Sequence, residues 1–355
     1  MIAVDLFCGA GGLTRGLLNA GIDVVLGIDL NEDCRRTFED NNKPANFLHK
    51  DLRCVTAAEI RRYFPPKCKQ PLLLVGCAPC QPFSSCRRDF ADSEESTLLR
   101  EFGRLATDLK PDWILIENVP GLTRVPGFST FRRFRKVLAD LQYNIAPGVI
   151  DAKAFGVPQT RRRFVMIGAK HTVPSLPEAT HGHAKLDYVT VREAIRHYPP
   201  IRAGRVHATI ANHRAADVAE INLTRLRHTP KDGGRRLDWS EELQLDCHRD
   251  YEGYSDVYGR MKWDAPAPTL TCRCYSISNG RYGHPTQNRA ISFREAAALQ
   301  TFPDEYVFFG KSNRSFGTQI GNAVPVLLAE VMGRHILSMV EATHNSRAHG
   351  RTRSA

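Results

Sequence analysis

The sequence predicts an α/β fold: a mostly parallel sheet with a second, smaller domain. In the first half, short apolar runs alternate with amphipathic stretches, from "IAVDLF" to "RRFVMIG". This alternation is typical of βαβ units, whose parallel sheet is covered by helices on both faces. From about Pro174 the periodicity weakens and Pro, Gly, His and Arg become frequent. The change indicates a separate, smaller domain in the middle of the chain.

The individual elements follow from the period of the apolar residues. The expected strands are "IAVDLF", "DVVLGID", a third strand before Asp51, "PLLLVG", "DWILIEN" and "RRFVMIG". The expected helices of the first half include "NEDCRRTFEDN", "LLREFGRLATDL" and "FSTFRRFRKVLADL". Helical periodicity returns in "SFREAAALQTF" and in "PVLLAEVMGRHILSMV", which is long enough to pack on the first domain.

These patterns predict three regions. Residues 1–200 form the first domain, which is completed by residues 310–343. Residues 201–309 form the second domain together with a hinge. Residues 344–355 are polar and lack an apolar face, so we expect a disordered tail.

Composition favours a polyanionic partner and a cytoplasmic location. Lys and Arg outnumber Asp and Glu by 49 to 38 in the 355 residues, which gives a net charge of +11 and favours nucleic acid. No basic segment precedes the apolar N-terminus, and no apolar run approaches the ~18 residues of a membrane span. The 10 cysteines, without an export signal, indicate reduced thiols rather than a disulfide framework.

The loop after the first strand, "DLFCGAGG", suits a nucleoside. Gly9 and Gly11 allow close backbone approach, and Asp29 lies about 20 positions after Gly9, where an acid can bond a ribose hydroxyl. Thr14 replaces the third glycine of the dinucleotide fingerprint, so a cofactor without a pyrophosphate fits better. Asp51 is then available to an adenine amino group. The alternative is a tight turn followed by acids that start helices.

The fourth strand leads into "GCAPCQPFSS", in which Cys80 lies between two prolines. A redox Cys-x-x-Cys pair normally begins a helix, but Pro82 and "SSCRRD" give no helical start. A buried, inert thiol is unexpected at the edge of a sheet where ligands bind. These observations favour a catalytic nucleophile.

A metal at these cysteines is the other alternative. Zinc needs about four ligands, and Cys77 and Cys80 have no second pair at matching spacing. The nearest further candidates are Cys272 and Cys274 with His284. We predict no metal site.

Six motifs, in order, resemble the bacterial DNA (cytosine-5)-methyltransferases of restriction-modification systems. They are "DLFCGAGG", "PCQPFS", "ENVPGL", "FGVPQTRRRFVMIG", "REAAALQTFP" and "QIGNAVP", and the resemblance covers nearly the whole chain outside the variable middle. It implies the Rossmann-like fold of S-adenosylmethionine-dependent methyltransferases. It also implies an enzyme that transfers a methyl group to carbon 5 of a flipped-out cytosine in double-stranded DNA. The chain departs from the family at Cys77 and Ala78, where the family often has Gly and Pro.

The resemblance also assigns roles to residues. Cys80 would attack carbon 6 of the cytosine, and Glu117 would bond its amino group and ring nitrogen 3. Arg163, with Arg161 and Gln159 on the same strand face, would hold the base and the loop. The S-adenosyl-L-methionine pocket would be lined by Phe7, Gly9, Gly11, Asp29, Leu30, Asp51, Leu52, Pro79 and Asn322.

The chemistry of these residue types agrees with those roles. Carbon 5 of cytosine is a poor nucleophile, and thiolate addition at carbon 6 makes it enamine-like and able to accept a methyl group. Glu117 must share a proton with the base as charge develops; the alternative is a capping or salt-bridged surface glutamate. The arginine run 161–163 could instead be a solvated basic edge. Extruding the base from the duplex costs a few kcal/mol.

The middle segment, 201–309, would be the target-recognition domain. Arginine or lysine bound to guanine is the commonest direct contact to a base edge. The candidates are Arg260, Lys262, Thr269, Arg273 and Arg281. The alternative for each is contact with phosphate, which positions the protein without reading sequence.

Three rival functions can be compared with the motifs. A tRNA cytosine methyltransferase of the same fold usually carries a Cys-Phe-Thr element, which the middle region lacks. A silent DNA-binding homologue should have lost Cys80 or Glu117, and a NAD-dependent oxidoreductase is disfavoured by Thr14. We expect a monomer, because each methyl transfer needs one flipped base and one cofactor. We also expect a cytoplasmic, nucleoid-associated enzyme without membrane contact, with a cognate restriction endonuclease as a candidate partner.

Overall fold

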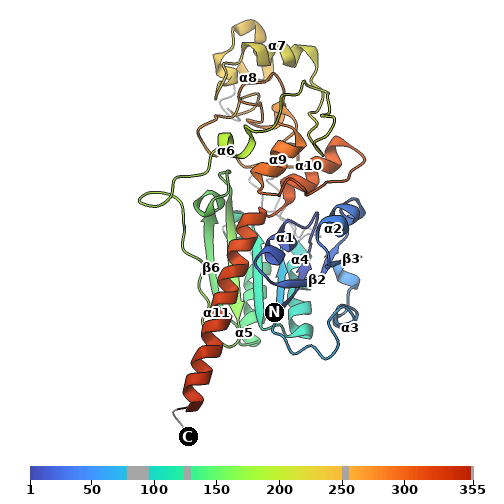
Figure 1. Ribbon diagram of the computed structural model, residues 1–355, viewed down its shortest axis with the longest axis vertical. Helices are drawn as coiled ribbons and strands as arrows, with labels where there is room; N and C mark the ends of the chain where they lie inside the picture. Colours follow the sequence, from blue (N-terminus) through green and yellow to red (C-terminus); the bar gives the residue numbers. More distant parts are fainter. Residues whose placement is uncertain (78–95, 124–128, 250–255, 353–355) are drawn as a thin grey trace. The chain divides into compact units, whose positions relative to one another are not determined.

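The computed structural model describes residues 1–77, 96–123, 129–249 and 256–352 (Figure 1). The chain divides into two compact units. Unit 1 contains Met1–Asp151, Arg162–Ala179 and Val326–Ala355, and unit 2 contains Ala152–Arg161 and Thr180–Pro325. The first half of the chain therefore contributes most of unit 1, and the C-terminal helix completes it.

Unit 1 is built on a seven-stranded sheet in the order β3-β2-β1-β4-β5-β7-β6. Strands β1 to β5 run parallel, and β7 is antiparallel to both β5 and β6. This confirms the predicted α/β fold with a mostly parallel sheet. The strands are β1 (Ile2–Leu6), β2 (Asp23–Asp29), β3 (Asn46–His49), β4 (Leu72–Gly76), β5 (Trp113–Asn118), β6 (Asn144–Asp151) and β7 (Arg162–Ala169).

The central strands are buried on both faces. Every residue of β1, β4 and β5 is buried, as expected for strands that helices cover on both sides. One face carries the core cluster in which Val4, Leu74 and Ile116 pack with Phe102 and Phe134 of the helices beside the sheet. The helices of unit 1 are α1 (Gly12–Asn19), α2 (Arg35–Asn41), α3 (Ala57–Arg61), α4 (Ser96–Leu109), α5 (Ser129–Asp140) and α11 (Val326–Thr352).

Strand β6 was not predicted from the sequence. It lies at the edge of the sheet, has only half-buried and exposed residues, and contains Pro147. Proline cannot donate to a β-ladder and is tolerated on edge strands. The weak apolar pattern and the proline together explain why the segment does not resemble a strand.

Helix α11 packs on α1 in unit 1 (Figure 1). A Cβ atom at Gly16 would come within 2.4 Å of the Ala329 Cβ and the Val326 carbonyl, so glycine is needed for the close approach.

Among the described residues, the stretch Asn313–Thr343 is long and apolar enough to cross a membrane by length and composition. This is weak evidence for a span, because a core helix meets the same test. The structure also differs from the predicted tail at 344, since α11 continues to Thr352.

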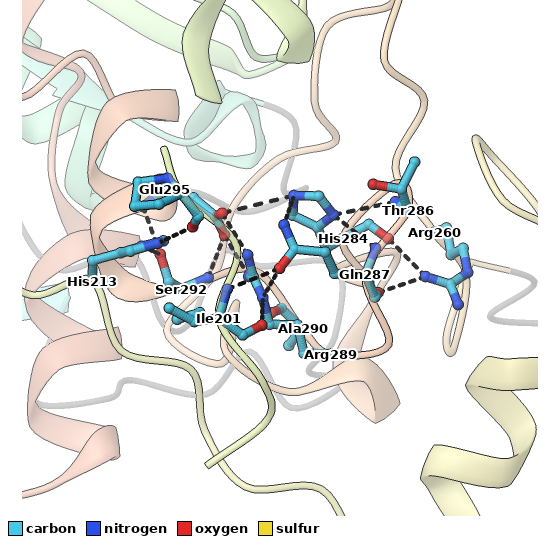
Figure 2. A network of polar contacts seen from close by, with 11 residues as sticks. Ile201, His213, Arg260, His284, Thr286, Gln287, Arg289, Ala290, Ser292 and Glu295 are labelled. Atoms are coloured by element: carbon cyan, nitrogen blue, oxygen red, sulfur yellow. Dashed lines mark hydrogen bonds and ion pairs between the residues drawn. The ribbon is translucent and has the colours of Figure 1, made fainter. Parts of the chain in front are cut away.

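Unit 2 has short helices and a small apolar core around Leu226, Trp239 and Tyr258. Much of its interior is polar: the side chains of Arg260, Arg289 and Arg294 are almost fully buried. Its helices are α6 (Val191–Ile195), α7 (Glu220–His228), α8 (Asp246–Arg249), α9 (Phe293–Leu299) and α10 (Asn313–Asn322). Figure 2 shows the polar network that joins several of its segments.

The centre of this network is Glu295 on α9. Arg289 donates to both carboxylate oxygens at 2.7 Å, and the backbone N–H of Ser292 donates to Oε2 at 2.7 Å. His284 lies with Nε2 3.7 Å from Oε1 (Figure 2). The Arg289 contacts lower the pKa of the Glu295 carboxyl to about 2 in spite of its burial, which acts in the opposite direction.

The two units differ in their boundaries from the predicted domains. Residues 152–161, 180–200 and 310–325 belong to unit 2 by their contacts, whereas the sequence patterns placed them in the first domain. Residues 310–325 carry α10, and α11 begins immediately afterwards at Val326 in unit 1. The return to helical periodicity therefore did not mark the return to unit 1. The assignment of 201–309 to target recognition stays a prediction.

Candidate active site

The strand order places one topological switch point in the sheet. From β1 the chain proceeds to β2 and β3 on one side, while β4 and β5 lie on the other side. Ligands of open α/β sheets bind outside the carboxyl ends of the strands at such a point. The loop after β1 begins at Phe7, and the loop after β4 begins at Cys77. These two loops therefore lie at the edge where a ligand is expected.

The loop after β1 has an unusual backbone. Phe7, Gly9 and Gly11 all have positive φ angles, of 63°, 52° and 89°. Such angles are uncommon for a residue with a side chain, and strain of this kind collects at functional sites. The Gly9 N–H donates to Asp29 Oδ2 at 2.8 Å, so Asp29 at the end of β2 holds the loop in place.

The backbone beside Asp29 is open at Gly9. A Cβ atom built on Gly9 would meet nothing within 4 Å among the described residues. Leu30 is 61% exposed at the same edge. Burial raises the pKa of the Asp29 carboxyl, while backbone N–H donors including those of Asn31 and Gly9 act against that shift. Open backbone, an acid and an exposed apolar side chain suit a nucleoside with no phosphate.

Thr14 has a structural role that its position in the sequence did not indicate. Its hydroxyl donates to Asp5 Oδ2 at 2.6 Å, and Asp5 is fully buried below the loop. Burial is the largest cause that raises the pKa of Asp5 to about 7, and Asp29 adds to it. Thr14, which replaces the third glycine of the dinucleotide fingerprint, therefore donates to one oxygen of a buried acid.

Asp51 and Leu52 already have contacts within unit 1. The Asp51 carboxylate accepts from the Arg53 side chain at 2.6 Å and from its backbone N–H at 2.9 Å, and these bonds lower the pKa of Asp51. An adenine amino group would have to share this carboxylate with Arg53. The Leu52 side chain is 4% exposed and belongs to the core cluster. Only the backbone of Leu52 is therefore a candidate for cofactor contact, and its predicted role in the cofactor pocket stays a prediction.

Glu117 lies at the carboxyl end of β5 with a partner on each side. Gly76 of β4 pairs with Ile116 of β5, so the next positions, Cys77 and Glu117, are neighbours. The Cys77 thiol donates to Glu117 Oε2, with Sγ at 2.7 Å. Glu117 pairs with Val165 of antiparallel β7, which makes Arg163 its diagonal neighbour on the same face. The Arg163 Nε lies 2.9 Å from Glu117 Oε1.

The two oxygens of Glu117 are not equivalent. The Arg163 Nε is close enough to Oε1 for an ion pair, but no hydrogen bond of good geometry reaches Oε1 among the described residues. The side chain of Glu117 is 5% exposed and that of Arg163 is 12% exposed. A buried carboxylate oxygen in this state can accept a hydrogen bond from a ligand.

Pro79 and Cys80 lie outside the described residues, so their predicted roles stay predictions. The described part of the loop ends at Cys77, three positions before Cys80 in the sequence. The contact of Cys77 with Glu117 was not predicted. The only signal for it in the sequence was the departure from the family residue at that position.

Gln159 and Arg161 do not share a strand face with Arg163. Strand β7 begins at Arg162, and the two residues before it belong to unit 2. Arg161 is buried and donates to the carbonyls of Leu270 and Ala323, at 2.9 and 3.1 Å. The sequence prediction extended the two-residue alternation of β7 beyond the N-terminal end of the strand. The residues hold loop backbone in unit 2, and a direct contact with the base has no support from this geometry.

Gln159 makes a similar set of contacts within unit 2. Its amide donates to Gln300 Oε1 at 3.0 Å, and its own Oε1 accepts from the Leu270 N–H at 2.9 Å. Asn322 is exposed at the end of α10 and accepts from the Cys272 thiol at 2.8 Å. Its predicted role in the cofactor pocket stays a prediction.

The predicted DNA-recognition residues fall into two groups. Arg260 is 1% exposed and donates to the carbonyls of Leu226, His284 and Gln287, so the prediction that it reads DNA is wrong. A buried arginine and a base-reading arginine look alike in a sequence. His284, a candidate metal ligand with Cys272 and Cys274, instead faces Glu295.

The other recognition candidates keep their side chains at or near the surface. Lys262 and Arg273 are exposed, and Arg281 is half-buried and paired with Asp256. The Thr269 hydroxyl donates to the Thr160 carbonyl at 2.6 Å, so it is already engaged within unit 2. Their contacts with DNA stay predictions.

Comparison with known proteins agrees with this architecture. The chain is 40% identical over 346 residues to the Type II methylase M.HgiDII of Herpetosiphon aurantiacus, which covers 96% of each chain. It is 33% identical to the Type II methyltransferase M1.HphI of Haemophilus parahaemolyticus, over 95% of this chain and 86% of that one.

Solved structures share the fold. A prophage-encoded DNA modification methyltransferase of E. coli superimposes with a TM-score of 0.75 at 23% identity, over 96% of this chain and 99% of that one. The S. pombe Dnmt2 methyltransferase gives 0.60 at 18%, over 96% and 98%. The sequence model described as C-5 cytosine-specific DNA methylase matches residues 1–338. The chain therefore belongs to the family of C-5 cytosine-specific DNA methylases.

Proposed function

We propose that this chain transfers a methyl group from S-adenosyl-L-methionine to carbon 5 of a flipped-out cytosine in a specific double-stranded DNA sequence. The observation that carries the proposal is the burial and hydrogen bonding of the Glu117 carboxylate. Its buried carboxylate lies at the ligand edge of the sheet, pairs with Arg163, and has one oxygen that no well-aligned hydrogen bond reaches among the described residues. A base with an amino group and a ring nitrogen presents matching groups.

The reaction needs a nucleophile and a shared proton. The Cys80 thiolate adds to carbon 6 of the cytosine, carbon 5 then takes the methyl group, and loss of the proton from carbon 5 lets the thiol leave. Glu117 bonds the exocyclic amino group and shares a proton with ring nitrogen 3 as charge develops on the ring. Arg163 keeps Glu117 in place beside the base and balances its charge.

The edge around Gly9 fits S-adenosyl-L-methionine. Asp29 accepts hydrogen bonds from the ribose hydroxyls, and the open backbone at Gly9 allows the ligand to approach closely. Phe7 and Leu30 provide apolar contacts for the adenine, and Asp51 accepts from its amino group while it keeps its bond to Arg53. When bound, the cofactor supplies an electrophilic methyl group. Pro79 and Asn322 are proposed to complete the pocket.

Two further residues act at a distance from the chemistry. Arg161 and Gln159 hold the backbone at Leu270 and, for Arg161, at Ala323. We assign them a positioning role, because bonds from buried side chains fix the course of loop backbone. Their loss should change the geometry of these loops rather than remove a group that touches the base.

The relatives suggest the biological setting. Both of the named relatives are described as Type II enzymes. We place this chain as the modification enzyme of a restriction-modification system, which protects a site that a cognate endonuclease would cut. It would then act as a monomer in the bacterial cytoplasm, on DNA of the nucleoid. A sedimentation coefficient that does not change with concentration supports the monomer, and a dimer species contradicts it.

The test is transfer of a labelled methyl group to unmethylated bacterial genomic DNA, with total tRNA as a parallel acceptor. We expect 5-methylcytosine in DNA for the wild type and none for Cys80→Ala. Glu117→Gln should keep DNA binding while it loses transfer. Bisulfite sequencing of the product then identifies the methylated site.

The other outcomes distinguish the rival functions. Label in tRNA alone contradicts the proposal and supports an RNA-modifying enzyme. DNA binding without label in either acceptor supports a silent regulator. Label in DNA that persists in Cys80→Ala contradicts the assignment of the nucleophile only.

A further inference from the structure

The thiol of Cys77 contacts the carboxylate on which the proposed reaction depends. Cys77 follows β4, Glu117 ends β5, and the register of the two parallel strands makes them neighbours. The Cys77 Sγ lies 2.7 Å from Glu117 Oε2. The family often has glycine at this position, and glycine has no side chain that could make this contact.

The two partners of Glu117 approach different oxygens. Cys77 contacts Oε2 from one neighbouring strand, while Arg163 of the other neighbouring strand approaches Oε1. Rotation about the last side-chain bond of a glutamate is broad and nearly two-fold, so one partner does not fix the carboxyl plane. Two partners on opposite oxygens restrict that rotation. The plane of the carboxylate then has a defined orientation before the base arrives.

A thiol suits a carboxylate that shares a proton. Its S–H is a weak donor and its sulfur a weak acceptor, and with an ordinary pKa near 8.5 it stays protonated at neutral pH. It can donate to the ionised carboxylate and accept from the protonated one. A lysine or arginine at the same place could only donate.

We propose that Cys77 is a positioning residue for methyl transfer, which orients the Glu117 carboxylate through a hydrogen bond to Oε2 so that Oε1 is presented to the cytosine. This inference rests on the proposed function, because it assumes that Glu117 bonds the base. It differs from the assignment of Cys80, since Cys77 forms no covalent bond. A side chain that only filled space at this position would occupy the same volume without affecting the protonation of Glu117.

The first experiment measures the contact without activity. The S–H stretching band of Cys77 is identified by infrared spectroscopy as the band that disappears in Cys77→Ala. We expect this band to move to higher wavenumber in Glu117→Gln, because an amide oxygen is a weaker acceptor than a carboxylate. A band that stays at the same position overturns the contact.

The second experiment separates orientation from packing. Cys77→Ala should lower kcat by about 10-fold, the effect of losing a hydrogen bond to a charged group, with little change in the KM for S-adenosylmethionine. Cys77→Ser keeps a donor and an acceptor and should restore kcat to within about 3-fold. The acidic limb of the kcat profile should move to higher pH in Cys77→Ala, since the donor favours the ionised carboxylate.

Cys68→Ala is the matched control. Cys68 precedes β4 at its amino end, whereas Cys77 follows at the carboxyl end. Both thiols are half-buried, and Cys68 packs against the core cluster of the sheet. This variant should leave kcat and the pH profile unchanged. If Cys77→Ala also equals the active wild type, or if serine does not rescue it, the positioning role is wrong while the proposed function stands. A wild type without methyl transfer contradicts the proposed function itself.

Discussion

Two buried glutamates of this protein, each beside an arginine, have different surroundings. In unit 2, Glu295 receives bonds of 2.7 Å on both oxygens from Arg289 and a third from the Ser292 N–H (Figure 2). In unit 1, Arg163 approaches one oxygen of Glu117, and that oxygen has no well-aligned hydrogen bond among the described residues.

The difference separates a structural acid from a functional one. A carboxylate with charge-assisted hydrogen bonds on both oxygens stabilises the fold, and a substrate would have to compete with those bonds. A buried carboxylate with an open oxygen is costly for folding, and such groups collect at functional sites. Burial and an arginine neighbour are common to both, so neither feature alone identifies the site. The hydrogen bonds of the individual carboxylate oxygens distinguish the two glutamates.

The largest expected effect is on activity at Glu117. Replacement by glutamine keeps the shape of the side chain but removes its charge and its ability to share a proton. We expect kcat to fall by about 10²- to 10⁴-fold, the range of general acid-base catalysis, with cofactor binding retained. Single-turnover methyl transfer and isothermal titration with S-adenosylmethionine measure the two quantities. A variant that keeps most of its kcat would contradict the role of Glu117.

Glu295→Gln should affect folding instead. Arg289 would be left buried with an amide in place of its counter-ion, and breaking a buried ion pair costs about 3–5 kcal/mol. Unfolding in urea, followed by the fluorescence of Trp239 and the other tryptophans, measures the loss. Glu117→Gln serves as the matched control, with a smaller loss of stability. The comparison fails if Glu117→Gln is the more destabilised of the two.

The pH dependence of stability should have opposite signs in the two units. Burial lowers the pKa of His284 to about 4, although Glu295 opposes the shift. His284 Nδ1 accepts from the backbone N–H groups of Thr286 and Gln287, so the neutral ring carries its proton on Nε2. The unfolded chain then binds more protons, and unit 2 loses stability as pH falls from about 6.5 towards 4, by on the order of 3 kcal/mol.

Asp5 in unit 1 acts in the other direction. Its pKa is raised to about 7, so the folded state binds more protons than the unfolded state between pH 4 and 7. This contribution to stability is complete at low pH and is lost as pH rises through 7. Asp5→Asn should therefore flatten the pH dependence of unit 1 and leave that of unit 2 unchanged. Hydrogen exchange read separately in the two units is the measurement.

The sequence predicted the sheet well because its central strands are buried on both faces and therefore nearly continuously apolar. It missed β6, where an edge position and Pro147 remove that signal. The motifs led to Glu117 and Arg163, whose pairing follows from strand register. They could not reveal that Arg260 is internal, since its partners are backbone carbonyls from segments far apart in the chain. Carbonyl groups occur at every residue and leave no mark in a sequence.

The smallest effects are expected at the surface of unit 2, where they sharpen the contrast between internal and exposed arginines. Arg273 is exposed, whereas Arg281 is paired with Asp256, its Nη2 lying 2.5 Å from Oδ1. If both face phosphate, Arg273→Ala should weaken DNA binding a few-fold and reduce the salt slope by about 1. Arg281→Ala should do less, because Asp256 already balances its charge. Fluorescence anisotropy across a salt series measures both slopes. A larger loss confined to one DNA sequence would instead indicate that Arg281 leaves Asp256 and reads a base.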